Sequence, residues 1–451
     1  MMKKTLCIIL MTMMILCSCN QTPQMGNPDD TAESIFTGET IPLVRARNAF
    51  YADGSLYYCK NNFMRFTMLE SGHDQVLCFD PLCSHDDQTL LLDCLCPAVC
   101  FQDSLLARVL VDDRKAWFLA TVFPEAESEK AVRYQLRCMD LDSMKTKIYL
   151  EKNEMRIWDF WKYGDDIYLL MATPKNREDG TLSTSGGDIY RLDGTKVELL
   201  YASPDGKRAS LLGSGPDSLY FTTDGIVQQA SPDFSLIADA SDYLPTFGVN
   251  QQIYGGYVYY QKKTGNIKSI DGMMTEGDYD ENVSTYRSGG YHEAALYRRK
   301  IGDDGMEELV YTPMLYPDEF MKECNYFIDP SNGTIYLVPL DTVCVGYTVW
   351  EEKVSIAAAM GITKPILTNV FSSSNGRLVA VDPVTLEAQD VISDADVDVL
   401  DIFAVEGKKV MGKFKLNNIE KLMELKENYD GRHNSVSSSL DYEYYGAVSL
   451  D

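Results

Sequence analysis

One segment of the sequence, LCFDPLCSHDDQTLLLDCLCPA, concentrates residue types that bind metals or form covalent bonds. Its reactive side chains, together with one cysteine just beyond it, are Cys78, Cys83, His85, Cys94, Cys96 and Cys100. Three thiolates and an imidazole form a closed tetrahedral zinc site of the structural type. Cys78, Cys83, His85 and Cys96 offer that ligand set, so a structural zinc site is one prediction for the segment.

A catalytic cysteine–histidine pair is a second alternative, since Cys83 and His85 lie two residues apart. Residues at that spacing share one face of a strand only where no turn intervenes, and Asp80-Pro81 favours a turn beside them. A thiolate nucleophile also needs a base that a third side chain orients. The sequence identifies no such third residue, so we assign no catalytic residue.

The chain begins MMKKTLCIILMTMMILCSCNQ, in which two lysines precede an apolar run. The run is shorter than the roughly 20 residues that a membrane-spanning helix needs, and the pattern is typical of a secretory signal peptide. Leu16-Cys17-Ser18-Cys19 resembles a bacterial lipobox. The resemblance implies that residues 1–18 are removed and that Cys19 carries acyl chains such as palmitate, which anchor the protein in a membrane.

The mature chain is expected to be strongly acidic and extracytoplasmic. Residues 19–40 are polar and rich in Pro, Gly, Asn and Asp, a composition typical of a flexible tether. After residues 1–18 are removed, 39 basic residues face 67 acidic ones, a net charge of −28. Such a surface repels phosphate backbones and anionic lipids. We therefore expect no nucleic-acid partner, and we expect membrane attachment through Cys19 alone.

Disulfide bonds are the third alternative for the cysteine segment, because thiols outside the cytoplasm tend to pair. Nine cysteines remain besides Cys19: 59, 78, 83, 94, 96, 100, 138, 324 and 344. Nine is an odd number, so at least one cannot pair within the chain. Those at 59, 138, 324 and 344 lie in apolar runs and are expected to be buried as small hydrophobic residues. The segment would then hold two disulfides and one free thiol.

Short apolar and aromatic runs, bounded by Gly, Asp, Asn or Pro, recur along the chain and predict strands and hairpins. They begin near residues 56, 116, 167, 219, 257 and 335. Units of about four strands that repeat at this scale are typical of a β-propeller. We predict an all-β fold, a β-propeller of six or seven blades over residues 41–415, with Asn61-Asn62 and Asp193-Gly194 as hairpin turns.

The repeats resemble bacterial surface lipoproteins that carry a TolB-like or similar propeller domain. The cysteine segment adds to this likeness, because it resembles a Cys-x-Asp-Pro-x-Cys-x-His…Cys-Pro motif associated with such lipoproteins. The resemblance covers most of residues 41–415 and implies a propeller in the cell envelope. A shared fold does not define a function.

Two further segments depart from the strand pattern. Residues 417–431 predict a short C-terminal helix, with an Asn cap and Gly431 as the stop, inside a C-terminal region of residues 416–451. The insertion at 271–293 is our candidate for a binding-face loop, because long loops on a rigid scaffold often carry function. Its tyrosines Tyr279, Tyr286 and Tyr291 are the candidate ligand-binding residues.

The function predicted from these patterns is binding rather than catalysis. The sequence contains no G-x-S-x-G elbow, phosphate loop or dinucleotide fingerprint. We expect a lipid-anchored, extracytoplasmic interaction module for a glycan, a peptide or an envelope protein. An enzyme is the alternative, a propeller hydrolase or lyase that acts on polysaccharide or peptide. A structural assembly protein of the envelope is a third alternative.

Overall fold

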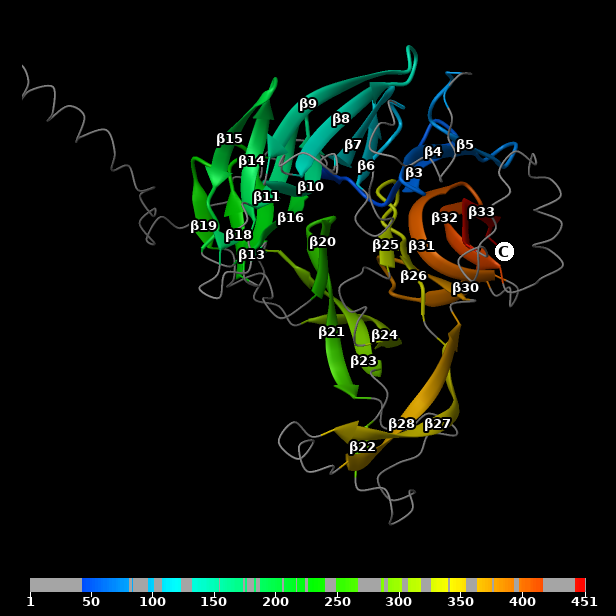
Figure 1. The fold of residues 1–451 in the computed structure, drawn as a ribbon. Helices are drawn as coiled ribbons and strands as arrows, with labels where there is room; N and C mark the ends of the chain where they lie inside the picture. Colours follow the sequence, from blue (N-terminus) through cyan, green and yellow to red (C-terminus); the bar gives the residue numbers. More distant parts are fainter. Residues whose placement is uncertain are drawn as a thin grey trace, which may run out of the picture.

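Seven antiparallel sheets, the blades, follow one another along the chain around a common centre (Figure 1). The computed structural model describes residues 43–80, 83, 96–100, 108–122, 132–153, 155–172, 175–176, 182–183, 187–204, 207–215, 217–223, 226–239, 249–266, 285–287, 291–301, 307–317, 326–339, 341–353, 363–374, 377–392, 397–416 and 443–450. These residues contain no helix, and so none that could cross a bilayer.

Each blade is built from strands that pair in chain order. Blades 1 and 2 are β2 (Ala49–Ala52), β3 (Ser55–Lys60), β4 (Phe63–Met68) and β5 (His73–Val76), then β6 (Val109–Asp112), β7 (Lys115–Val122), β8 (Arg133–Asp140) and β9 (Lys145–Asn153). Blades 3 and 4 are β10 (Arg156–Tyr163), β11 (Asp166–Ala172), β14 (Asp188–Asp193) and β15 (Lys196–Tyr201), then β16 (Ala209–Ser214), β17 (Leu219–Thr223), β18 (Ile226–Ala230) and β19 (Ile237–Asp239).

The chain completes the ring with three more blades. Blades 5 and 6 are β20 (Val249–Tyr254), β21 (Tyr257–Asn266), β23 (Tyr291–Lys300) and β24 (Glu308–Pro317), then β25 (Tyr326–Ile328), β26 (Ile335–Leu337), β29 (Leu378–Val381) and β30 (Ala388–Ile392). Blade 7 is β31 (Val397–Glu406), β32 (Lys409–Leu416) and β33 (Glu443–Ser449). First strands of several neighbouring blades contact one another, as β2 contacts β6 and β31 and β16 contacts β20, so these strands lie toward the axis. In blade 3 one more strand, β1 (Leu43–Arg45), pairs with β10 on its inner side.

Apolar packing between the blades closes the ring. Among the described residues, seven separate apolar clusters lie between neighbouring blades, one at each of the seven junctions. The junction of blades 7 and 1 is filled by Tyr58, Phe403 and Tyr445, with the Tyr58 and Tyr445 rings stacked at 3.8 Å. The all-β propeller is therefore confirmed, and its blade number is seven.

Local sequence explains how consecutive strands are joined. Asn61 and Asn62 connect β3 to β4, and both have positive φ angles, 51° and 64°. Two such residues in succession give the turn whose twist matches a β-hairpin. Gly194, with φ of 61°, occupies the turn between β14 and β15. The predicted turn at Asn61-Asn62 is confirmed, whereas the second turn lies one residue further along, at Gly194-Thr195, because Asp193 still pairs with Lys196.

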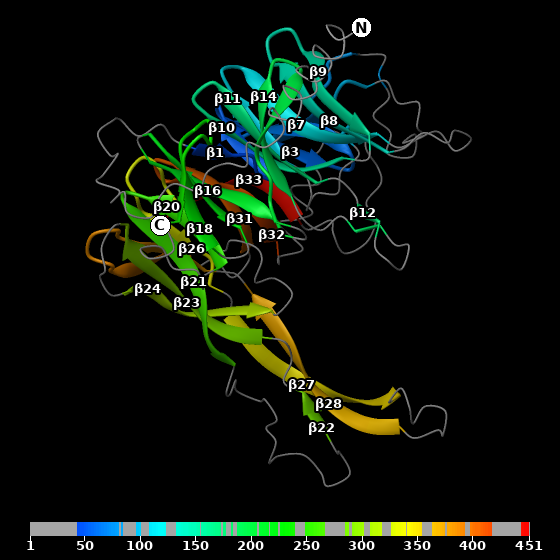
Figure 2. The same ribbon diagram turned by 90° about the vertical axis from the view of Figure 1, so that its left-hand side faces the viewer.

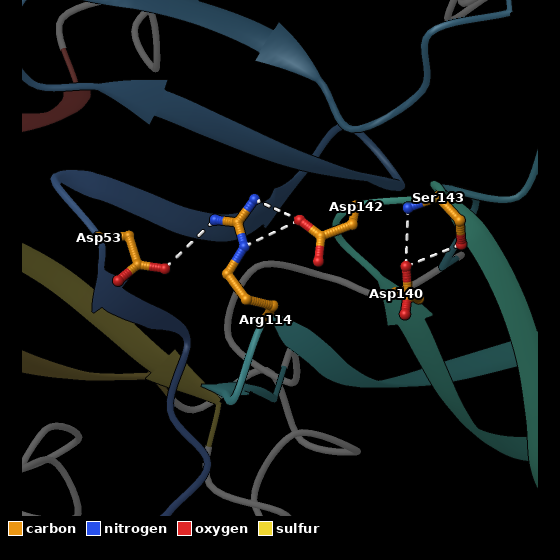
Figure 3. A network of polar contacts seen from close by, with 5 residues as sticks. All are labelled: Asp53, Arg114, Asp140, Asp142 and Ser143. Atoms are coloured by element: carbon orange, nitrogen blue, oxygen red, sulfur yellow. Dashed lines mark hydrogen bonds and ion pairs between the residues drawn. The ribbon is translucent and has the colours of Figure 1, made fainter.

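Hairpin turns of neighbouring blades also bind one another. Arg114, between β6 and β7, lies between Asp53 and Asp142 (Figure 3) and forms ion pairs of 3.3 and 3.0 Å with them. Beside it, Asp140 accepts hydrogen bonds from the backbone N and Oγ of Ser143, both at 2.7 Å. These charged and polar groups at the surface are paired with one another, so the network stabilises the hairpin turns that carry them.

Part of the chain lies outside the ring. β27 (Asp341–Lys353), β28 (Thr363–Ser374) and β22 (Thr285–Arg287) form a separate sheet that extends away from the blades in both views (Figures 1 and 2). β12 (Lys175–Asn176) and β13 (Leu182–Ser183) form a short hairpin. The predicted signal peptide, tether and helix at 417–431 lie outside the described residues.

Candidate functional site

The structure gathers three of the predicted cysteines. The sulfur atoms of Cys78, Cys83 and Cys96 all lie within 4.8 Å of one another. Cys96 is 4% exposed, and the other two side chains are partly buried. We refer to these three residues as the cysteine cluster. His85 and Cys94, predicted for the same site, lie outside the described residues.

The edge of blade 1 positions the cysteine cluster. Met64 on β4 accepts a hydrogen bond from the backbone N of Leu77 at 2.8 Å and donates one to the O of Ala98 at 2.7 Å. One residue of β4 therefore holds the chain both where it leaves toward Cys78 and where it returns after Cys96. The backbone N of Cys83 donates to the O of Asp80 at 3.1 Å, which holds Cys83 close to the end of blade 1. Pro81 of the predicted Asp80-Pro81 turn lies outside the described residues.

The returning segment also contacts blade 2. The backbone N of Thr121 donates to the O of Cys100 at 2.9 Å, and Arg137 Nη1 donates to the O of Val99 at 2.8 Å. Burial lowers the pKa of Arg137, while the nearby Cys100 and Cys96 oppose that shift. Burial, with hydrogen bonds to Cys83 and Cys78, raises the pKa of the Cys96 thiol.

Cys100 does not belong to the cysteine cluster. Its thiol interacts with Cys59 on β3, and this contact, with burial, raises the pKa of Cys59 well above its ordinary value. Both residues are fully buried, and Cys59 Sγ also lies 3.2 Å from Met64 Sδ. The predicted burial of Cys59 is confirmed, as is that of Cys138 on β8. Cys59, Cys78, Cys96, Cys100 and Cys138 are free thiols in the structure.

The candidate tyrosines of the 271–293 insertion lie elsewhere. Tyr286 is on β22 and pairs with Leu367 in the separate sheet, and Tyr291 begins β23 opposite Pro317. Tyr279 and the lipidation residue Cys19 lie outside the described residues. The roles of these residues remain predictions.

A second candidate site, which the sequence analysis missed, lies near the propeller axis. Residues 43–47 run along the inner strands: the N of Ala46 donates to the O of Phe160 at 3.0 Å, and Arg47 exchanges backbone hydrogen bonds with Val109. β1 (Leu43–Arg45) pairs antiparallel with β10, and the N of Leu43 donates to Ser214 Oγ on β16 at 2.9 Å. The N-terminal segment thus contacts blades 2, 3 and 4 from inside.

This segment brings arginines together around one buried carboxylate. Asp159 on β10 is 1% exposed; Arg45 Nη2 donates to its Oδ2 at 2.8 Å, and Arg108 Nε lies 3.3 Å from its Oδ1. Arg156 and Arg208 complete the group. We call Arg45, Arg108, Arg156 and Arg208, with Asp159 and Trp158, the arginine cluster.

Two of these arginines lie over an indole ring. The guanidinium carbons of Arg156 and Arg208 lie 3.9 and 4.8 Å from the centre of the Trp158 ring. Stacking on an aromatic face favours a cation and orients the guanidinium plane. Trp158 Nε1 is buried and has no hydrogen-bond partner among the described residues. A buried donor of this kind normally has a protein, water or ligand partner.

The electrostatics of the arginine cluster are opposite to those of the whole chain. The cluster holds four guanidinium groups and one carboxylate in a protein of net charge −26. The side chain of Arg208 is open to solvent, yet surrounding protein atoms lower its pKa, and so do Arg108, Arg45 and Arg156, while Asp159 opposes this shift. The cluster therefore carries an excess of positive charge that only Asp159 offsets within the group.

The topology explains why these arginines meet. Arg108 precedes β6, Arg156 begins β10 and Arg208 precedes β16, so each stands at the start of the first strand of its blade. First strands run in the same direction around the axis, which brings their beginnings to one end of the propeller. The sequence signal is an arginine at the start of three successive blades, and it becomes visible only when the blade register is known.

Comparison with known proteins agrees with the fold. No protein-family model matches the chain, and no curated protein sequence does. Solved structures that resemble it include a puromycin-hydrolyzing peptidase from Mycobacterium tuberculosis (9% identity, TM-score 0.41, 82% of this chain and 50% of that one). A second is an oligogalacturonate lyase in complex with manganese (11% identity, TM-score 0.39, 75% of this chain and 77% of that one). A third is TolB from Acinetobacter baumannii (9% identity, TM-score 0.31, 80% of this chain and 65% of that one).

The sheet topology and the interblade clusters define the class: this chain is a seven-bladed β-propeller. Its structural neighbours include lyase, peptidase and TolB proteins. At such low identities and TM-scores, their activities provide no argument about the activity of this chain.

Proposed function

We propose that this protein is a lipid-anchored, extracytoplasmic β-propeller that binds a carboxylate-bearing ligand at the arginine cluster without transforming it. The observation that supports the proposal is the group of four arginines, two on Asp159 and two over Trp158, at one end of the propeller axis in a strongly acidic chain. A guanidinium group binds a carboxylate through two parallel hydrogen bonds. The anchor rests on the lipobox resemblance and stays a prediction.

The charge distribution favours an anionic ligand at this position. A surface of net negative charge repels anions at long range, so local positive charge determines where an anion can bind. The guanidinium groups of Arg156 and Arg208 lie over the Trp158 ring, and a guanidinium that stacks on an aromatic face keeps its N–H groups for other partners. Arg45 and Arg108 are ion-paired with Asp159, and so they mainly hold the site together.

Replacing Arg208 by Ala is expected to weaken binding of an oligouronate by about 10- to 100-fold, the equivalent of one or two charged hydrogen bonds. Arg208→Lys should lose less affinity than Arg208→Ala, because the positive charge remains. It should still bind more weakly than wild type, because the planar guanidinium fork is lost. The measurement is titration calorimetry at two salt concentrations, with the matching neutral oligosaccharide and an acidic peptide as comparison ligands. Affinity should fall with salt.

The matched control is Arg377→Ala, which removes an exposed arginine paired with Asp390 on blade 6. It should leave binding unchanged. Equal affinity of wild type and Arg208→Ala for every anion tested would refute the proposal. A new carbon–carbon double bond or new reducing ends in the incubated oligouronate would instead establish the alternative, a lyase or a hydrolase.

A further inference from the structure

We propose that Cys78, Cys83 and Cys96 are three ligands of a structural zinc ion that fastens the 78–100 connection between blades 1 and 2. This site is separate from the proposed ligand site, since the cysteine cluster is on the blade 1 edge and the arginine cluster lies on the inner strands of blades 2 to 4. The inference therefore stands independently of the proposed function.

The geometry suits a metal better than a disulfide. Zinc–sulfur bonds of about 2.3 Å in a tetrahedron place the sulfur atoms about 3.8 Å apart. The three sulfurs already lie within 4.8 Å of one another, so small side-chain shifts bring them to that spacing. A disulfide joins only two sulfurs at about 2.05 Å, which would leave the third thiol of the converging, partly buried trio without a partner. A metal uses all three.

The donor set selects the kind of metal. Thiolates are soft ligands that favour zinc over magnesium or calcium, which take oxygen ligands. When zinc binds, three S–H bonds break, three Zn–S bonds form and three protons leave to solvent. The product carries one net negative charge before a fourth ligand is counted. Arg137 lies beside the segment, bonded to the O of Val99, and its charge interacts with Cys96.

The cysteine cluster lies where a bound metal would stabilise the connection between blades 1 and 2. Residues 96–100 contact both blades, through Met64 and Asn62 on one side and Thr121 and Arg137 on the other. Cys78 and Cys96 lie at the two ends of a long connection, and Met64 binds the backbone beside both of them. A zinc ion joining them closes this connection, and closing a long loop is where a cross-link reduces unfolded-chain entropy most.

The experiment is metal analysis with native mass spectrometry on the full chain, purified in reducing buffer without chelator and then supplied with zinc. We expect one zinc per chain, and its loss in Cys83→Ser and in Cys96→Ser. Cys138→Ser is the matched control, because Cys138 is a buried cysteine on β8 outside the cluster, and it should keep one zinc. His85→Ala separately tests the fourth ligand that the sequence predicts.

Cobalt provides a readout that does not depend on folding of the variants. Wild-type protein loaded with Co²⁺ should show the intense thiolate-to-metal charge-transfer absorption of a tetrahedral site with several sulfur ligands. Substoichiometric zinc after loading, zinc retained by both serine variants, or a cobalt spectrum without sulfur ligation would each overturn the proposal. A mass two units low, with two of the three cysteines unlabelled after denaturing alkylation, would establish a disulfide instead.

Discussion

Replacing Asp159 by Asn is expected to lower the free energy of unfolding by about 3 kcal/mol, since removing one member of a buried ion pair leaves the other charge uncompensated. Asp159 is the carboxylate on which Arg45 and Arg108 converge, and its Oδ1 also accepts a hydrogen bond from the N of Phe160 at 3.0 Å. Its side chain is 2% exposed, but those of Arg108 and Arg45 are 19% and 52% exposed. Because the arginines are partly hydrated, we expect a loss of stability at the lower end of the range for buried ion pairs.

Thermal and denaturant unfolding of this variant should be compared with Asp390→Asn. Asp390 forms an ion pair of similar length, 2.9 Å, with Arg377, but both side chains are at the surface. Exposed pairs contribute about 0–1 kcal/mol, so the control should unfold close to wild type. Equal effects of the two substitutions would show that Asp159 has no special role in balancing the arginines.

The same variant links stability to the proposed function. With Asp159 neutral, the arginine cluster has a larger positive excess, so an added polyvalent anion should raise the unfolding midpoint of Asp159→Asn more than that of wild type. A neutral oligosaccharide at the same concentration should raise neither. An equal response of both proteins to the anion would indicate that it acts elsewhere on the surface.

Replacing Tyr445 by Ala is expected to lower the free energy of unfolding by about 3–5 kcal/mol, the range for truncating a large buried aromatic side chain. Tyr445 on β33 is 8% exposed and stacks on Tyr58 at a 13° interplanar angle, with Phe403 at 6.1 Å. Burial raises the pKa of its hydroxyl. The effect should be large because this junction joins the last blade to the first, so its loss opens the ring.

The control for this prediction is Tyr445→Phe, which keeps the ring and its packing. It should unfold within about 1 kcal/mol of wild type, because volume-conserving changes disturb a packed core least. Unfolding of Tyr445→Ala at the midpoint of Tyr445→Phe would show that the junction between blades 7 and 1 does not limit stability.

Patterns that depend on near neighbours were readable in the sequence. Alternating apolar and aromatic runs define strands because successive side chains point to opposite faces, and Asn61-Asn62 defines a turn because both residues tolerate positive φ. The cysteine segment also belongs to this group: Cys78, Cys83 and Cys96 lie in one short stretch, so a common site could be predicted. The choice among a zinc site, disulfides and a catalytic thiol could not be predicted, since it depends on where the sulfur atoms lie in space.

The tertiary structure decided what depends on distant contacts. Seven blades follow from seven interblade clusters, and the last of them needs Tyr445 to meet Tyr58, nearly the whole chain away. Cys100 has Cys59 as its neighbour rather than the cysteine cluster, because the chain returns along β4.

The arginine cluster shows this division most clearly. Arg108, Arg156 and Arg208 are about 50 residues apart in the sequence, and each alone is an ordinary charged residue at a strand start. The sequence by itself determined the strands, the turns and the short-range cysteine grouping, because these rest on local backbone and side-chain preferences. Only ring closure, which aligns the first strands of the blades and places residues 43–47 along them, joined the arginines into one positively charged site.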